Sequence, residues 1–244
     1  MAFRASAPRL SALFELRTTT IAPPLLTAAK DFAARAAPSA KAAYGDAFVG
    51  AFHPDLGGAL NVRHDLFRFD SHAHRARAHA AASAHPELSA ILTDARGCVT
   101  GERSASFAEA TAVLTDAGLP GAAAFSPPAR APGDDPVYEM RTYQLKLGYD
   151  AVPSFAALYG SGLVHKLRAD TTGQSSLVTL LYSETGPLNV VIELWRHAST
   201  EGAQRSREAS RGATEWRAAI AQIAQGALSF ETQTLVPVEG NRWC

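Results

Sequence analysis

The stretch YEMRTYQLK occupies residues 138–146, and a near copy of it, FELRTTTIA, occupies residues 14–22. Both begin with an aromatic residue and continue with Glu, an aliphatic residue, Arg and Thr. Aromatic residues and Thr are enriched in β-strands, so each stretch predicts a strand. The same strand written twice in a chain of 244 residues indicates an internal duplication.

The landmarks that follow each copy also recur in the same order. LNVRHDLFR at 60–68 matches LNVVIELWR at 188–196, and a glycine-containing turn precedes each of them. A helical stretch follows in each half, and each half then closes on a similar strand. The closing strands are SFAEATAVL at 106–114 and SFETQTLVP at 229–237. These matched landmarks predict a tandem repeat, in which Phe67 and Trp195 occupy equivalent buried places.

Each half has the order β-α-β-β-α-β, the split βαβ of ferredoxin-like folds. Its helices, expected at 23–43 and 71–92 and at 150–168 and 199–225, cover only one face of the sheet. The other face is apolar and has to be buried against a second layer. We therefore predict an α+β protein in which two tandem ferredoxin-like repeats pack sheet to sheet.

Composition divides the chain into four parts. Residues 117–136, AGLPGAAAFSPPARAPGDDP, are dense in Pro, Gly and Ala, which is typical of a linker. Arg4 and Arg9 lie in a stretch without acidic residues, which is typical of a mitochondrial presequence and also of a disordered terminus. The predicted parts are a tail or short presequence at 1–13, a first repeat at 14–115, a linker at 116–136 and a second repeat at 137–244.

Charge balance and cysteine content exclude several classes of protein. Lys plus Arg number 23 and Asp plus Glu number 23, so the chain lacks the overall basic field of a nucleic-acid-binding protein. No apolar run approaches the roughly 20 residues of a membrane-spanning helix. Cys98 and Cys244 are far apart and form no CxxC pair, which argues against a zinc ribbon or a disulfide framework and fits a reducing compartment.

Alternation along the strands gathers polar residues on one face. Glu15 and Arg17 share a face of the first strand, and the second repeat and the hairpin strands supply matching residues. These are Glu139, Arg141, Tyr143, Arg63, Asp65 and Glu193, with Asn61, Phe67, Asn189, Val191 and Trp195 on the same face. The opposite face is expected to pack against the helices, and it holds Val62, His64, Leu66, Val190, Ile192 and Leu194. The polar face is then expected to line the space between the two sheets.

Two interpretations of this polar face remain open. In the first, its charged and tyrosine residues bind a small polar ligand between the sheets. In the second, they form ion pairs that satisfy one another and hold the sheets together. The candidate ligand-binding residues are Glu15, Arg17, Arg63, Asp65, Glu139, Arg141, Tyr143 and Glu193.

The sequence predicts no catalytic residue, metal site or cofactor. Four histidines cluster on one predicted helix, but their spacings differ from the three or four residues of a helical metal pair, so a solvated helix face is expected. They are His72, His74, His79 and His85. The helix at 199–225 carries several arginines, which predict a solvated, ion-paired face or a docking surface for an anionic partner. They are Arg205, Arg207, Arg211 and Arg217.

The strand YEMRTYQLKLG, the hairpin ETGPLNVVIELWRH and the arginine-rich helix with Trp216 resemble the NIPSNAP family. In that family the first strand reads roughly Y-E-L-R-x-Y-x-L-K-P-G and the hairpin reads G-x-L-N-x-V-x-x-L-W. The resemblance covers residues 138–237 well and residues 14–114 more loosely. The chain departs from the pattern at Gly148, where the family tends to have Pro, and at ATEW (213–216), which replaces an Asp-Pro-x-Trp step.

The resemblance implies a dimeric α+β barrel formed within one chain and no established catalytic activity. It also implies a mitochondrial or vesicle-associated setting. There the protein is expected to be a scaffold, adaptor or accessory subunit with protein partners, either as a homodimer or within a larger complex. The alternative is a cofactor-independent enzyme or small-molecule binder of monooxygenase or isomerase type, with a cytoplasmic location left open. A packed space between the sheets favours the first reading, and a pocket with convergent polar groups favours the second.

Overall fold

The computed structural model describes residues 12–129 and 134–238 of the chain. The first half contains β1 (Leu13–Ile21), α1 (Leu26–Tyr44), β2 (Phe48–Leu56), β3 (Val62–Phe69), α2 (His72–Ser83), α3 (Pro86–Ala95) and β4 (Val99–Glu109). The second half contains β5 (Val137–Leu145), α6 (Ala151–Ala169), β6 (Ser175–Thr185), β7 (Val190–His197), α7 (Thr200–Gly212), α8 (Thr214–Gly226) and β8 (Ala227–Pro237). The predicted order β-α-β-β-α-β is confirmed in both halves, with the second helix of each half divided in two.

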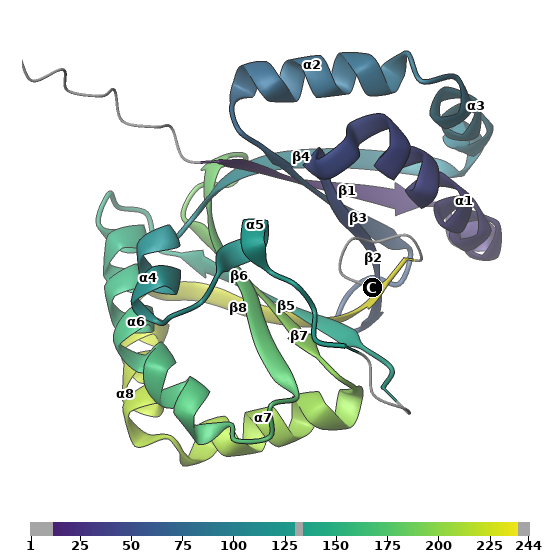
Figure 1. Cartoon of the computed structure of the whole chain (residues 1–244). Helices are drawn as coiled ribbons and strands as arrows, with labels where there is room; N and C mark the ends of the chain where they lie inside the picture. Colours follow the sequence, from purple (N-terminus) through teal and green to yellow (C-terminus); the bar gives the residue numbers. More distant parts are fainter. Residues whose placement is uncertain (1–11, 130–133, 239–244) are drawn as a thin grey trace, which may run out of the picture.

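The strands form one closed antiparallel barrel in the order β1-β3-β2-β8-β5-β7-β6-β4. Each half contributes four neighbouring strands, and the halves join where β2 pairs with β8 and where β4 pairs with β6. Joining the sheets at both edges leaves each edge strand paired, which protects it from association with other chains. The helices α1–α3 lie outside one half of the barrel and α6–α8 lie outside the other (Figure 1).

Local sequence signals repeat together with the fold. Ser71 and Ser199 cap α2 and α7, where their hydroxyl oxygens accept hydrogen bonds from backbone N–H groups of the first turn. Asn61 and Asn189 precede the equivalent strands β3 and β7. Each donates its side-chain amide to a carbonyl near the end of its half's first strand. The recurring LNV motif therefore ties each hairpin to the first strand of its repeat.

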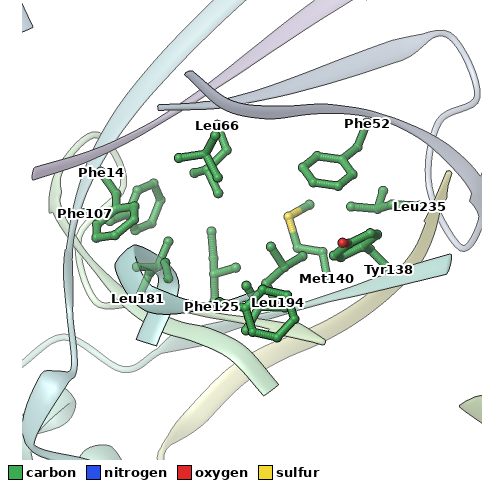
Figure 2. Packing of buried hydrophobic residues seen from close by; sticks show 14 residues of the cluster. Phe14, Phe52, Leu66, Phe107, Phe125, Tyr138, Met140, Leu181, Leu194 and Leu235 are labelled. Atoms are coloured by element: carbon green, nitrogen blue, oxygen red, sulfur yellow. The ribbon is translucent and has the colours of Figure 1, made fainter. Parts of the chain in front are cut away.

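Apolar side chains from both halves fill the barrel interior. Phe52 and Leu66 come from the first half and Tyr138, Met140 and Leu194 from the second, and Figure 2 shows them converging between the strands. The space that remains beside them measures about 20 Å³. In a barrel of this strand number the interior is just wide enough for side chains to fill. The space between the sheets is therefore a packed core.

Part of the expected linker belongs to this core. After β4 the chain forms α4 (Thr111–Asp116) and α5 (Gly121–Ala124), and Ala122 joins the barrel cluster. Phe125 joins it as well (Figure 2). The backbone N–H of Ala122 donates to Glu109 Oε1 at 2.8 Å, which fixes α5 against the end of β4. The Pro- and Gly-rich segment therefore has two roles: it joins the two halves, and it packs against the interior of the barrel.

None of the helices within the described ranges is both long enough and apolar enough to cross a bilayer.

Candidate functional site

The strand faces point the opposite way from the sequence expectation. Leu66, Ile192 and Leu194, expected against the helices, lie inside the barrel. Tyr143 and Trp195, expected between the sheets, pack against the helices. Alternation defines two faces of a strand but does not say which one the helices cover. A closed interior offers charged groups no water, so the apolar face is favoured inside and the polar face lies outside, beneath the helices.

Glu139 on β5 is buried beneath α7, where it binds two arginines. Its Oε2 accepts a hydrogen bond from Arg141 at 2.8 Å, and its Oε1 accepts from Arg207 at 2.6 Å and from Thr232 at 2.8 Å. Burial acts to raise the pKa of Glu139, but the charges and hydrogen bonds of Arg141 and Arg207 outweigh it and hold this pKa far below its usual range. Glu139 is therefore charged, and its oxygens are occupied.

A serine of β6 and a histidine of β7 extend this cluster. Ser175 Oγ lies 2.7 Å from His197 Nδ1, and His197 Nε2 lies 3.4 Å from Glu139 Oε2. Burial lowers the pKa of His197, so its imidazole is neutral at pH 7. The Nε2 distance is long for a hydrogen bond. Neither Ser175 nor His197 lines the pocket between α7, α8 and the strands β5 and β8. These two residues would therefore not contact a molecule bound in that pocket.

Glu193 on β7 is a second buried carboxylate, and it is 0% exposed. It accepts hydrogen bonds from the Tyr143 hydroxyl at 2.6 Å, the Tyr159 hydroxyl at 2.9 Å and Trp195 Nε1 at 2.6 Å. Arg141 Nη1 lies 3.8 Å away, so this guanidinium is shared between the two carboxylates. Burial and the neighbouring charge of Glu193 raise the pKa of both tyrosines well above 10, which keeps them protonated as donors.

Lys166 on α6 is buried between two indole rings. Its Nζ lies 3.7 Å from the ring centroid of Trp195 and 4.9 Å from that of Trp216. Burial, and to a smaller extent the positive charge of Arg141, lower the pKa of Lys166 to about 7. The faces of aromatic rings attract an ammonium group and offset part of the cost of burying it. Lys166 therefore changes its charge state near neutral pH.

The titration of Lys166 predicts a pH dependence of stability. The unfolded chain holds this proton up to its ordinary pKa of 10.5, whereas the folded protein releases it near 7. The unfolded state binds more protons between these values, so stability should rise by about 2 kcal/mol from about pH 7 to about pH 9. Chemical denaturation at both pH values measures the change, and Lys166→Met should remove most of it. An equal rise in that variant would assign the effect to another group.

A pocket of about 620 Å³ lies between the helices α7 and α8 and the outer face of β5 and β8. Strand register separates its polar and apolar residues, because Arg141 lies opposite Thr232 and the next pair on that face is Tyr143 opposite Phe230. The polar end is lined by Glu139, Arg141, Arg207, Ser210, Arg211 and Thr232. The apolar wall is lined by Tyr143, Trp216, Ile220, Ile223, Ala224, Ala227, Leu228 and Phe230. The pocket thus combines a cationic end with a wall that suits an apolar body.

The first repeat contains a related cluster around Glu15. Its carboxylate is paired with Arg17 at 3.2 Å, Arg75 at 2.6 Å and His79 at 2.8 Å, and it accepts from Ser104 at 2.9 Å. Burial acts to raise the pKa of Glu15, but the hydrogen bonds from His79, Arg75 and Ser104 hold it far below its usual range. The expectation of a solvated helix face is wrong for His79, because the spacing of histidines does not show which of them faces the sheet.

The predicted candidate residues fall into two clusters, one in each repeat, because strand register places Asp65, the partner of Arg63, opposite Arg17. Glu139, Arg141, Tyr143 and Glu193 come together beneath the helices of the second repeat. Glu15 and Arg17 lie in the corresponding place of the first repeat. Arg63 and Asp65 pair with each other along β3 at 2.6 Å. The ion pairs among them form within each half and not across the sheets, and whether any of these residues binds a ligand stays a prediction.

Sequence reasoning missed Lys166 and Tyr159, and it placed Arg207 on a solvated, ion-paired face or a docking surface without identifying the buried Glu139 as its partner. A signal for the first two was present, because Phe155, Tyr159, Leu163 and Lys166 recur at helical spacing on the apolar side of α6. A lysine on an apolar helical stripe indicates a buried cation with aromatic or acidic partners. Within the described residues, no group of three His, Cys, Asp or Glu side chains is placed to hold a metal ion.

A sequence model of the NIPSNAP family matches residues 14–112 and again residues 138–240. The chain belongs to the NIPSNAP family. The resemblance seen in the strand and hairpin motifs is thereby confirmed, and both halves are NIPSNAP repeats. A NipSnap homolog from Dictyostelium discoideum is 30% identical over 106 residues, which is 43% of this chain. The match spans only 44% of that relative's length.

Solved structures confirm the predicted dimeric α+β barrel fold for this NIPSNAP chain. A proposed monooxygenase from Fusobacterium nucleatum has a TM-score of 0.64 and 9% identity, over 94% of this chain and 93% of its own. A proposed monooxygenase from Lactobacillus acidophilus has a TM-score of 0.61 and 13% identity, over 96% of this chain and 98% of its own. At such low identity the likeness concerns the fold alone.

Proposed function

We propose that this NIPSNAP protein binds a small molecule with a largely apolar body in the pocket of its second repeat. The observation that carries this proposal is the 620 Å³ space in which several polar side chains converge at one end of an apolar wall. Its volume falls within the range of about 300–1,000 Å³ that is common for small-molecule sites. The packed barrel interior would by itself favour a non-catalytic scaffold, but the pocket lies outside the barrel.

Binding is better supported than catalysis. The oxygens of Glu139 and Glu193 accept hydrogen bonds from neighbouring side chains, so neither carboxylate is poised to take a proton from a ligand. The Tyr143 hydroxyl is directed at Glu193 and not at the pocket. A monooxygenase- or isomerase-like reaction therefore rests on fold likeness alone.

Filling the pocket should abolish binding of an apolar probe. Ala224 is an exposed residue of α8 that lines the pocket, so Ala224→Trp places a large side chain there at little cost to folding. Titration with the neutral fluorophore N-phenyl-1-naphthylamine should show an affinity at least about tenfold lower than for the parent. The matched control is Gln225→Trp, which adds the same ring beside the pocket. Equal affinities of the two variants would contradict the proposal.

The scaffold function remains a second candidate because of an apolar surface on the second repeat. Leu147, Tyr149 and Leu188 are 87%, 103% and 56% exposed, and they line a groove beside α6. Contiguous exposed apolar groups are typical of protein–protein contacts. Sedimentation of the purified protein tests whether this surface forms a homodimer. The mitochondrial location is a prediction from the family resemblance and from residues 1–13, of which 1–11 lie outside the described residues.

A further inference from the structure

We propose that the ligand of this pocket is a monoanionic organic acid. Its acidic head is bound by Arg207 and Arg211, and its apolar body lies against Trp216 and Phe230. The inference rests on the proposed function, because it specifies the chemistry of the molecule that the same pocket binds.

The charges around the pocket do not cancel. Glu139 and Glu193 supply two buried negative charges. Arg141 lies between them, and its positive charge balances one of the two. Arg207 pairs with Glu139 at 2.6 Å. Arg211 lines the pocket as a third arginine, and no carboxylate of the described residues forms an ion pair with it. With the Lys166 amine neutral, the three arginines exceed the two carboxylates by one positive charge, and this excess in a partly enclosed space favours a ligand with one negative charge.

The two arginines are placed to act together. Arg207 and Arg211 are four residues apart on α7, so their side chains share one face of the helix, and both line the pocket. Arg207 contacts Glu139 through Nη2, which leaves other donors of its guanidinium to face a ligand. Guanidinium groups match the geometry of carboxylate, sulfonate and phosphate oxygens, which is why an acidic head fits this end.

The body of the ligand is defined by the apolar wall. Leu228 and Phe230 on β8 are 64% and 52% exposed, although they stand on the pocket side of the strand. The ring centroids of Phe230 and Tyr143 are 4.6 Å apart. Trp216 lines the pocket from α8. Covering Leu228 and Phe230 would remove apolar surface from water, which stabilises the complex. Aromatic walls of this kind suit a flat or branched apolar body.

The first repeat lacks this chemistry at matching positions. In the second repeat, Phe230 lies opposite Tyr143 in the strand register. At the equivalent place of the first repeat, Glu102 lies opposite Thr19. Glu102 pairs with Arg17 at 3.1 Å, so the carboxylate neutralises the arginine of its own cluster. On α2, both Arg75 and His79 contact the buried Glu15, so the first repeat also has an arginine at this place. The aromatic wall with Phe230, and an arginine such as Arg211 without a carboxylate partner among the described residues, are therefore what distinguish the pocket of the second repeat.

A matched pair of dyes tests the charge of the ligand. 8-Anilinonaphthalene-1-sulfonate and N-phenyl-1-naphthylamine share one aromatic body, and only the first has a sulfonate. The parent protein should bind the sulfonate about tenfold more tightly, as expected for a charge-assisted hydrogen-bonded pair. Arg211→Met should remove most of this difference and leave the neutral dye unaffected. Arg217→Met is the control, because Arg217 is an exposed arginine of α8 outside this pocket.

The possible failures are distinguishable. If both dyes bind equally and Arg211→Met changes neither affinity, the inference about charge is wrong while the binding pocket stands. If Ala224→Trp and Gln225→Trp bind both dyes alike, the dyes bind elsewhere and the proposed function itself is wrong. An equal loss of sulfonate affinity in Arg211→Met and Arg217→Met would show a general effect of surface charge and overturn the assignment to Arg211.

Discussion

Replacing Trp195 with Ala is expected to lower the free energy of unfolding by about 3–5 kcal/mol. The Trp195 side chain is 1% exposed, so its removal leaves a large cavity between β7 and the helices. Its Nε1 donates to Glu193 at 2.6 Å, and its ring covers the ammonium of Lys166 at 3.7 Å. The variant loses apolar burial, one donor to a buried carboxylate and one aromatic partner of a buried cation.

Urea unfolding of Trp195→Ala measures this loss directly. Phe230→Ala is the matched control, because Phe230 is an aromatic residue of the same repeat that is 52% exposed. The Phe230→Ala substitution should lower the free energy of unfolding by less than about 1 kcal/mol, as surface substitutions usually do. A free energy of unfolding for Trp195→Ala equal to that of Phe230→Ala would show that the Trp195 site collapses without a cavity.

The repeat, the element order and the fold were predictable because they depend on patterns that lie within short windows. The strand YEMRTYQLK, its copy and the LNV hairpins each carry a local signal. The sequence predicts the closing strand of the first half at 106–114, but the strand lies at Val99–Glu109 and is followed by the helix Thr111–Asp116, so the SF match between the halves is not a structural one. The burial of Phe67 and Trp195, at 3% and 1% exposure, follows from their matching positions in this frame. Such signals are insensitive to the final arrangement of the two halves.

The orientation of the strand faces was not predictable from the same windows. Met140 and Arg141 alternate on β5, and either could face the helices as far as alternation is concerned. Closure of the barrel decides between them, because it places Met140 in a dry interior and leaves Arg141 within reach of Glu139 and Glu193. The pairing of β2 with β8 and the insertion of Phe125 are likewise long-range contacts that composition does not encode.

Replacing Arg141 with Met is expected to destabilise the protein by about 3–5 kcal/mol, because it removes one partner of a buried charge network. Arg141 lies 2.8 Å from Glu139 and 3.8 Å from Glu193. After the substitution Glu139 retains Arg207, but Glu193 keeps only neutral donors in a fully buried place. The stranded charge of Glu193 is then the main cost. Thermal and urea unfolding of the variant and its parent measure it.

The double variant Arg141→Met with Glu193→Gln should be more stable than Arg141→Met alone, because it removes the stranded charge. The Gln carbonyl still accepts hydrogen bonds from Tyr159 and Trp195, and the hydroxyl of Tyr143 is able to accept one from the amide. Recovery of about half the loss would identify Arg141 as a structural partner of the two carboxylates. If Arg141→Met instead unfolds like the parent and no longer binds the sulfonate dye, Arg141 is part of the anion site, and the two carboxylates serve to hold it there.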